Sequence, residues 1–206
     1  MFITFEGPEG SGKTTIANIV VKRLEELKLP VIYTREPGGS QIAEQIRKIL
    51  LKRNNTSMDK LTEALLFAAS RRQHLVEKVL PAIEKGEVVI CDRFIDSSLA
   101  YQGYARDIGI QKVMDINLFA TEGMLPDLTI YFDIDSELGL SRIDKDNNRE
   151  VNRLDLERLE FHKLVRQGYL EVLKLYPKRI VMIDASRSIE EVSEEVLNII
   201  LAKINK

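Results

Sequence analysis

Eight consecutive residues near the N-terminus combine glycines, a lysine and a threonine in a spacing suited to phosphate binding. The segment Gly7-Pro8-Glu9-Gly10-Ser11-Gly12-Lys13-Thr14 fits the pattern G-x-x-x-x-G-K-[ST], and Thr15 follows it. Glycine lets the backbone curl so that successive N–H groups point at phosphate oxygens. Lys13 is placed to reach β- and γ-phosphates, and Thr14 to hold Mg²⁺. An ordinary glycine-rich turn is the alternative, but the expected strand before and helix after the segment favour a nucleoside triphosphate site.

A second group of chemical interest follows the apolar run 88–91, where Asp92 and Arg93 stand side by side. An acidic residue at the carboxyl end of a strand is placed to hold Mg²⁺ or its waters. A fixed cation next to it suits a reaction that brings two phosphate groups together. A plain ion pair at the strand end is the alternative. The D-x-x-G and N-K-x-D strings of regulatory GTPases do not occur in the sequence.

Two pairs of residues four apart predict a site for a flat nucleobase. Phe67 and Arg71 share a face of an expected helix, and Ser98 and Gln102 share a face of another, with Tyr101 adjacent. An aromatic ring supplies stacking, and a guanidinium supplies several hydrogen-bond donors. Taken alone, Phe67 would suggest core packing and Arg71 a solvated helix face; together they favour base binding.

Arg35 opens the segment Arg35-Glu36-Pro37-Gly38-Gly39, directly after the second expected strand. A cation at the carboxyl end of a strand can reach the phosphate of an acceptor nucleotide. A surface ion pair with Glu36 is the alternative.

Residues 141–155 are densely charged and rich in asparagine, and they include Arg142, Arg149 and Arg153. We expect this segment to be a mobile lid that closes over bound nucleotides, excludes water and brings positive charge to the transferring group. A solvated charged loop is the alternative. The pattern does not decide which of these arginines reaches the phosphoryl group.

The elements that must position these residues alternate between short apolar runs and longer amphipathic ones, which predicts βαβ units and a parallel sheet. Strands are expected at 2–5, 31–34, 88–91, 128–134 and 180–183. Helices are expected at 13–27, at 96–106, 111–122, 156–173 and 189–204, and from about 59 until Pro81 kinks or ends the helix. We therefore predict one α/β domain over residues 1–206, of the P-loop NTPase type, with helices flanking a five-stranded parallel sheet in three layers.

Composition sets limits on the remaining possibilities. The 206 residues are 44% hydrophobic and 30% charged, which suits a globular domain, and the net charge of −2 argues against binding to a nucleic-acid polymer. No apolar run is long enough to span a bilayer. Cys91 is the only cysteine, so no intrachain disulfide can form, which fits a reducing cytoplasm. We interpret Cys91 as a buried strand residue.

Five segments, in this order, cover nearly the whole chain and resemble bacterial thymidylate kinases: FITFEGPEGSGKTT (2–15), REPGG (35–39), LFAASRR (66–72), DRFIDSSLAYQG (92–103) and NRLD (152–155). The resemblance implies phosphorylation of dTMP to dTDP with ATP and Mg²⁺, and a homodimer. Because positions 8–11 of the P-loop lack a basic residue, the chain resembles the members that place arginines in the lid. Lys13, Arg93, Arg149 and Arg153 are then the expected catalytic residues, with Arg142 on ATP.

The same resemblance assigns parts of the acceptor. Glu9 is expected to accept from the 3′-hydroxyl, and Tyr101 to fill the space beside C2′ and exclude ribonucleotides. Thymine offers an O4 acceptor and an N3–H donor, which Arg71 and Gln102 can pair with respectively. The nearest alternative is a kinase for another nucleoside monophosphate, and a more distant one is a P-loop ATPase that uses ATP as a switch.

Overall fold

The computed structural model describes residues 1–144 and 152–205. Its centre is a five-stranded sheet in the order β2-β3-β1-β4-β5, in which all neighbours run parallel. The strands are β1 (Phe2–Glu6), β2 (Val31–Arg35), β3 (Val88–Asp92), β4 (Leu128–Asp133) and β5 (Ile180–Asp184). The predicted fold class is confirmed, and the strands match the predicted apolar runs closely.

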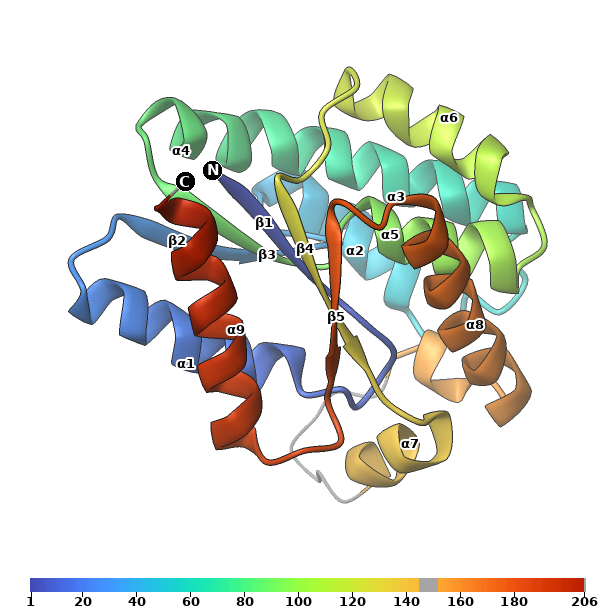
Figure 1. Ribbon diagram of the computed structural model, residues 1–206. Helices are drawn as coiled ribbons and strands as arrows, with labels where there is room; N and C mark the ends of the chain where they lie inside the picture. The colour runs from blue at the N-terminus through green and yellow to red at the C-terminus, as the bar shows by residue number, and fades with distance from the viewer. Residues whose placement is uncertain (145–151, 206) are drawn as a thin grey trace.

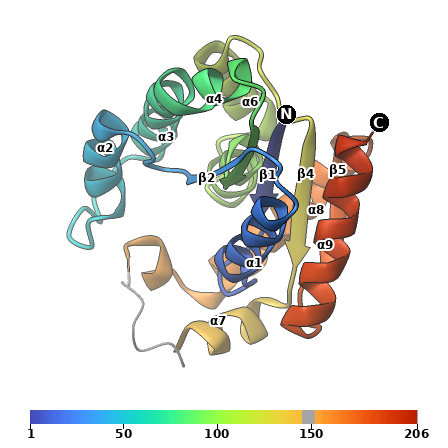
Figure 2. The same ribbon diagram turned by 90° about the vertical axis from the view of Figure 1, so that its left-hand side faces the viewer.

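Helices cover both faces of the sheet, as Figures 1 and 2 show. They are α1 (Lys13–Glu26), α2 (Gln41–Leu51), α3 (Lys60–His74), α4 (Leu80–Glu84), α5 (Ile95–Ser98), α6 (Ile110–Thr121), α7 (Ser136–Asp144), α8 (Leu159–Leu175) and α9 (Ile189–Ile204). Two π-helical turns, η1 (Leu75–Val79) and η2 (Leu99–Ala105), follow α3 and α5, and a 3₁₀ turn, η3 (Leu154–Leu156), precedes α8. In the described residues, no helix is long and apolar enough to cross a membrane.

Two hydrophobic clusters hold the three layers together, because successive side chains of a strand point to opposite faces. Ile3 and Phe5 of β1 pack in the cluster that includes α1 and α9. Phe2 of the same strand and Val89 of β3 pack in the other cluster, with residues of α3, η1 and α8. The central strands β1 and β3 thus contribute apolar side chains to both faces, which explains why their sequences are mostly apolar.

Three helical segments differ from the sequence-based expectation. The helix α2 is not predicted, and α7 extends through residues that were expected to begin the lid. The chain remains helical past Pro81, and the irregularity lies one turn earlier in the π-helical η1, where the Leu80 N–H donates to the Leu75 carbonyl. A π turn accommodates a helical proline, which lacks an N–H and crowds the preceding turn.

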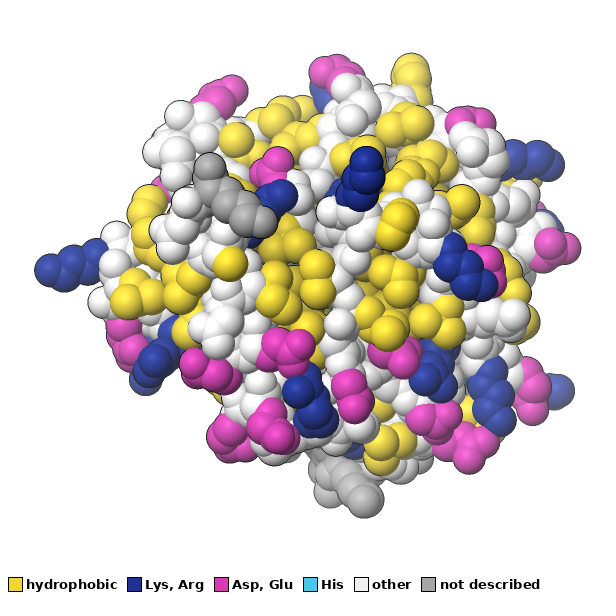
Figure 3. Space-filling view, viewed as in Figure 1, with side chains coloured by type: hydrophobic (Ala, Val, Ile, Leu, Met, Phe, Trp, Pro, Cys, Tyr) yellow, Lys and Arg dark blue, Asp and Glu magenta, His cyan; other side chains and the backbone are white. Residues whose placement is uncertain are grey.

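The edge strand β5 exposes part of its apolar side to solvent. Val181 is 36% exposed and Met182 is 50% exposed. In Figure 3, apolar side chains gather around the centre of the face that carries β5, with charged side chains below them. The chemistry-bearing residues lie elsewhere, at the carboxyl ends of the strands.

Candidate active site

A cleft of about 690 Å³ lies at the carboxyl ends of the strands and joins most of the residues predicted to bind ligands. Among its lining residues are Glu9, Gly10, Ser11, Gly12, Lys13, Thr14, Thr15, Arg35, Phe67, Asp92, Arg93, Ser98, Tyr101, Gln102 and Arg142. The predicted residues Gly7, Pro8, Arg71 and Arg153 are outside the lining. Arg149 lies outside the described residues. The phosphate cradle and the expected nucleobase site therefore face one shared space.

The P-loop connects β1 to α1 and bends around the Lys13 ammonium. Gly12 takes a left-handed φ of 79° immediately before α1 begins at Lys13. Lys13 Nζ donates to the carbonyls of Gly7 and Pro8, each over 3.0 Å, and to Ser11 Oγ over 3.1 Å. Burial, together with the nearby positive charge of Arg93, lowers the pKa of Lys13 to about 8. The ammonium thus sits at the mouth of the loop, where a polyphosphate would be its strongest partner.

The P-loop also packs against α7 through a pair of glycines. A Cβ on Gly10, whose φ is +73°, would lie 2.0 Å from the Gly139 carbonyl oxygen. A Cβ on Gly139 would lie 2.4 Å from the carbonyl oxygen of Glu9. Only glycine allows so close an approach of two backbones, so the phosphate cradle and α7 are in direct contact.

Arg93 is fixed by the P-loop and not by its neighbour Asp92. Its Nη2 donates to Glu9 Oε1 over 2.7 Å, and its Nη1 donates to the Gly7 carbonyl over 3.1 Å and to Tyr169 Oη over 3.1 Å. The guanidinium also lies 5.1 Å from the centre of the Tyr101 ring. These contacts argue against a simple ion pair with Asp92 at the strand end, because the cation is bonded to the P-loop instead.

Asp92 faces the first turn of α1. Its Oδ2 accepts a hydrogen bond from the Thr14 hydroxyl over 2.9 Å and another from the Tyr33 hydroxyl over 3.2 Å. A carboxylate and a hydroxyl held this close are the hard oxygen ligands that Mg²⁺ prefers. The donor set at this point therefore fits a magnesium site.

Arg71 is 1% exposed, and most of its donors are occupied by protein. Nε donates to Glu36 Oε2 over 2.8 Å, Nη1 donates to Ser98 Oγ and to Asn117 Oδ1, and Nη2 donates to the Phe94 carbonyl over 2.8 Å. An arginine has five N–H donors. Among the described residues, four of these donors have partners and a second N–H on Nη2 is left over, so the guanidinium is held in one fixed orientation.

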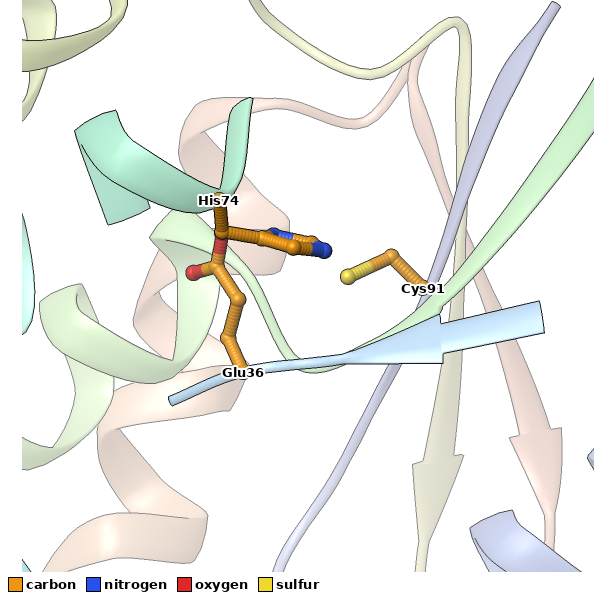
Figure 4. Close-up of side chains that lie close together, drawn as sticks. All are labelled: Glu36, His74 and Cys91. Carbon is orange, nitrogen blue, oxygen red and sulfur yellow. The ribbon is translucent and has the colours of Figure 1, made fainter. Parts of the chain in front are cut away.

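Glu36, the partner of Arg71, forms a buried cluster with His74 and Cys91, with ligand atoms within 4.8 Å of one another (Figure 4). His74 Nδ1 bonds to Glu36 Oε1 over 2.9 Å, and its Nε2 bonds to Thr34 Oγ1 over 2.7 Å. Burial raises the pKa of the Cys91 thiol well above its usual value, and Sγ donates to the Arg93 carbonyl. Both imidazole nitrogens are occupied and the thiol stays protonated, so the cluster braces Glu36 and does not suit a metal. Cys91 is a buried strand residue, as predicted.

Arg35 and Arg142 line the cleft at opposite ends. Arg35 pairs with Glu44 Oε1 over 3.0 Å, and the alternative partner Glu36 is bound to Arg71 instead. Arg142 donates to the Ala185 carbonyl over 2.9 Å, at the end of β5. Arg35 therefore lies at the end of β2, and Arg142 joins α7 to the loop after β5.

Arg153 is buried and shares a hydrogen-bond partner, Glu63, with Gln102. It is 7% exposed, donates to Glu63 Oε2 and to the Leu50 carbonyl, and lies outside the cleft lining. This arrangement places the residue between α2 and α3. The role predicted for Arg153, contact with the phosphoryl group, would require it to leave Glu63.

Further lining residues come from elements that the motif analysis passes over. Arg47 and Leu51 belong to α2, and Arg187 and Ile189 follow β5. The helical spacing of apolar residues from 42 to 50 would have indicated α2. The loop after β5 could have been inferred from topology, since ligands bind where parallel strands end.

A P-loop at the carboxyl end of a parallel sheet, with a fixed cation bonded to it in the same cleft, defines the chain as a P-loop nucleotide-binding protein of the kinase class. Comparison with known proteins narrows this class. The model of the thymidylate kinase family matches residues 5–196. The chain belongs to the thymidylate kinase family.

Individual relatives agree with this assignment. The thymidylate kinase of Clostridium novyi is 63% identical over 195 residues, which cover 95% of each chain. That of Anoxybacillus flavithermus is 57% identical over 206 residues, covering 100% of this chain and 99% of the relative. A crystal structure of thymidylate kinase from Ehrlichia chaffeensis superimposes with a TM-score of 0.77 at 34% identity, covering 97% of this chain and 98% of that one.

Proposed function

We propose that this chain transfers the γ-phosphoryl group of ATP to dTMP and releases dTDP and ADP, a step in dTTP synthesis. The observation that carries the proposal is the shared cleft. Lys13 of the P-loop and Arg93 line it together with Phe67 and Gln102, the residues expected to bind the base. Membership of the thymidylate kinase family supports the choice of both substrates.

The reaction needs charge stabilisation more than it needs a base. A phosphate monoester has a second pKa of about 6, so dTMP is already largely dianionic at neutral pH. Repulsion between two polyanions is then the main barrier, and Lys13 and Arg93, which both donate to the Gly7 carbonyl, offset it as two neighbouring cations. The phosphoryl oxygen of dTMP attacks the γ-phosphorus in line, and ADP leaves.

ATP is proposed to bind along the P-loop, residues 7–15, with Arg142 at the nucleoside end. The backbone N–H groups of the loop and the positive end of α1 receive the phosphates. Thr14 and Asp92 would hold Mg²⁺, which supplies a positive charge between the β- and γ-phosphates.

The acceptor is proposed to bind on the other side of Arg93. Phe67 stacks on the base, and the free N–H of Arg71 reaches O4. Gln102 and Ser98 line the polar edge of the base, and Arg35 reaches the phosphate. The Tyr101 hydroxyl donates to Glu9 Oε1 over 3.2 Å, which supports a joint role for these two residues beside the deoxyribose.

We further propose that residues 1–206 form one domain in which 141–155 act as a lid, with Arg149 and Arg153 delivering positive charge to the transferring group. Arg142, at the start of that segment, already lines the cleft. Closure would exclude water, which otherwise hydrolyses ATP.

We also propose that the protein forms a homodimer and acts in the cytoplasm. Leu61 and Leu65 on α3 are 50% and 56% exposed, and Phe119 on the adjacent α6 is 89% exposed. Apolar side chains this exposed on neighbouring helices are typical of an interface between copies. The lone cysteine, with its buried thiol, suits a reducing compartment.

The test is a panel of acceptors at fixed ATP and Mg²⁺, with ADP formation as the signal. We expect no ADP without an acceptor, the highest kcat/KM with dTMP, and about 10–200-fold less with dUMP, which lacks only the methyl group. Discrimination against dCMP should approach about 10⁴-fold, because its amino group faces the Arg71 donor. ADP release without any monophosphate would instead indicate a switch ATPase, and efficient use of dCMP would overturn the acceptor site.

A further inference from the structure

Gln102 touches both the cleft and a buried carboxylate behind the cleft wall. Its side chain lines the cleft and is 1% exposed overall. Its Nε2 donates to Glu63 Oε1 over 2.9 Å. Glu63 is itself 1% exposed and does not line the cleft, and both of its carboxylate oxygens accept hydrogen bonds from protein side chains.

The chemistry of Glu63 dictates which end of the Gln102 amide faces it. Glu63 also accepts from Arg153 through Oε2 and from Arg106 Nε over 3.4 Å through Oε1. With N–H donors on both of its oxygens, the Glu63 carboxylate acts here only as a hydrogen-bond acceptor. The amide must therefore turn its NH₂ group toward Glu63, which leaves its carbonyl oxygen on the opposite side.

The side-chain oxygen Oε1 of Gln102 is left available for a ligand. Within residues 1–144 and 152–205, no side chain or backbone group donates a hydrogen bond to Oε1. If the amide were reversed, its oxygen would face the Glu63 carboxylate across a hydrogen-bond distance, which is repulsive in a buried site. The orientation is thus locked by charge rather than by packing.

We propose that Glu63 is a positioning residue that fixes the Gln102 amide with its oxygen toward the base, so that the site selects a ring nitrogen that carries hydrogen. This inference rests on the proposed acceptor site. Thymine and uracil present N3–H, which the oxygen accepts, whereas cytosine presents a lone pair at N3, which the oxygen repels. Glu63 then contributes to base choice without touching the base.

The arrangement that fixes the Gln102 amide, called the lock below, is formed by Glu63, Gln102 and Arg153, which come from three distant segments of the chain. Glu63 stands in the first turn of α3, Gln102 in η2, and Arg153 directly before η3. The Arg153 backbone N–H also donates to the Leu51 carbonyl, which fixes that segment against α2. The two arginines offset the charge of Glu63, and Glu63 in turn accepts the hydrogen bond of the Gln102 amide.

The experiment compares two ligands that differ at N3. O4-methylthymidine 5′-monophosphate keeps the methyl group and an oxygen at C4 but has a lone pair at N3. Calorimetric titration gives the Kd of dTMP and of this analogue for the wild type and for Glu63→Gln, whose amide can either accept or donate. We expect strong preference for dTMP in the wild type, and a fall in that preference of at least about tenfold in Glu63→Gln, the worth of one hydrogen bond.

Arg106→Gln is the matched control, because it removes another partner of Glu63 and leaves the contact with Gln102 intact. Its preference should equal that of the wild type. If Glu63→Gln does not fold because Arg153 is left unpaired, Glu63→Gln/Arg153→Met removes both buried charges and is measured in its place.

The outcomes separate the two proposals. A wild type that binds both ligands equally would overturn the assignment of Gln102 to the base, and the lock with it. A wild type that prefers dTMP, with an unchanged preference in Glu63→Gln, would overturn only the role of Glu63. An equal loss of preference in Arg106→Gln would also count against it, since general disturbance of the charge network would then suffice.

Discussion

The Nη2 atom of Arg93 donates to the Oε1 atom of Glu9 over a distance of 2.7 Å. Glu9 belongs to the P-loop after β1 and Arg93 follows β3, so this ion pair joins the carboxyl ends of two neighbouring strands. Their side chains are only 12% and 17% exposed respectively, and Arg93 has a left-handed φ of 69°. The cation is held in place before substrates bind, which is the preorganisation that electrostatic catalysis requires.

Arg93→Lys should be badly impaired although it keeps the charge. Lysine lacks the planar fork that bonds to Glu9 and Gly7 at once, so the cation would lose its fixed position. We expect kcat to fall by about 10²–10³-fold, measured by coupled ADP release at saturating ATP and dTMP. Arg166→Lys, which alters an ion pair with Asp133 outside the cleft, is the control. Full activity in Arg93→Lys would reduce Arg93 to a structural role.

Lys13→Ala should abolish most turnover and leave the fold intact. Lys13 is the only lysine of the P-loop, and its ammonium faces the place proposed for the β- and γ-phosphates. A loss of about 10²–10³-fold in kcat is expected. Circular dichroism checks the fold, and Lys163→Ala, which removes an exposed ion pair with Glu137, is the matched control. A folded Lys13→Ala protein with normal turnover is incompatible with the proposed site.

Arg149→Ala and Arg153→Ala should both lower kcat more than they weaken dTMP binding, and Arg153→Ala should also lower stability. Arg153→Ala leaves the buried Glu63 carboxylate without one of its guanidinium partners, which costs about 3–5 kcal/mol for a buried pair. Thermal unfolding and kcat are measured on both variants, with dTMP affinity from calorimetry. If both variants lose only dTMP affinity, these arginines belong to the acceptor site and not to a lid.

The buried carboxyl group of Glu6 should make stability depend on pH. It accepts hydrogen bonds from the Phe94 N–H, Ser97 Oγ and Tyr169 Oη. Burial, reinforced by the negative charge of Asp96, raises the pKa of Glu6 to about 7 from an ordinary value of 4.5. Because the pKa is raised on folding, the stabilising contribution is complete below pH 4.5 and is lost as the pH rises through about 7.

Glu6→Gln, which cannot ionise, should therefore gain stability relative to the wild type between about pH 5 and pH 8. The measurement is the difference in Tm between the two proteins across this range, and the exposed Glu194→Gln should follow the wild type. A difference in Tm that does not change with pH would mean that Glu6 keeps one protonation state throughout.

Much of the fold could be predicted from the sequence because buried parallel strands read as apolar runs. Residues 2–5 and 88–91 have this pattern, and both lie in strands of the central sheet. The helix α2 directly follows Gly38 and Gly39, which are typical of a turn, and its apolar spacing begins only at Ile42. The π-helical turn before Pro81 depends on tertiary packing, which a local pattern does not encode.

The candidate site divides in the same way. Motif spacing could place Lys13 and Thr14 because a P-loop is a local structure. The partner of Arg35 could not be predicted, since Glu44 meets it only after α2 has folded back. The contact of Arg153 with Glu63 joins residues far apart in the sequence, and no local pattern points to it.

The contact between Gly10 and Gly139 ties two parts of the chain into one mechanical unit. With backbone against backbone, no side chain is present to yield, so a displacement of α7 is passed to the loop that surrounds the phosphates. Gly139 can therefore affect nucleotide binding without contacting the nucleotide. Any residue larger than glycine at position 139 would push on the P-loop. The geometry of the phosphate cradle therefore also depends on a residue more than a hundred positions away in the sequence.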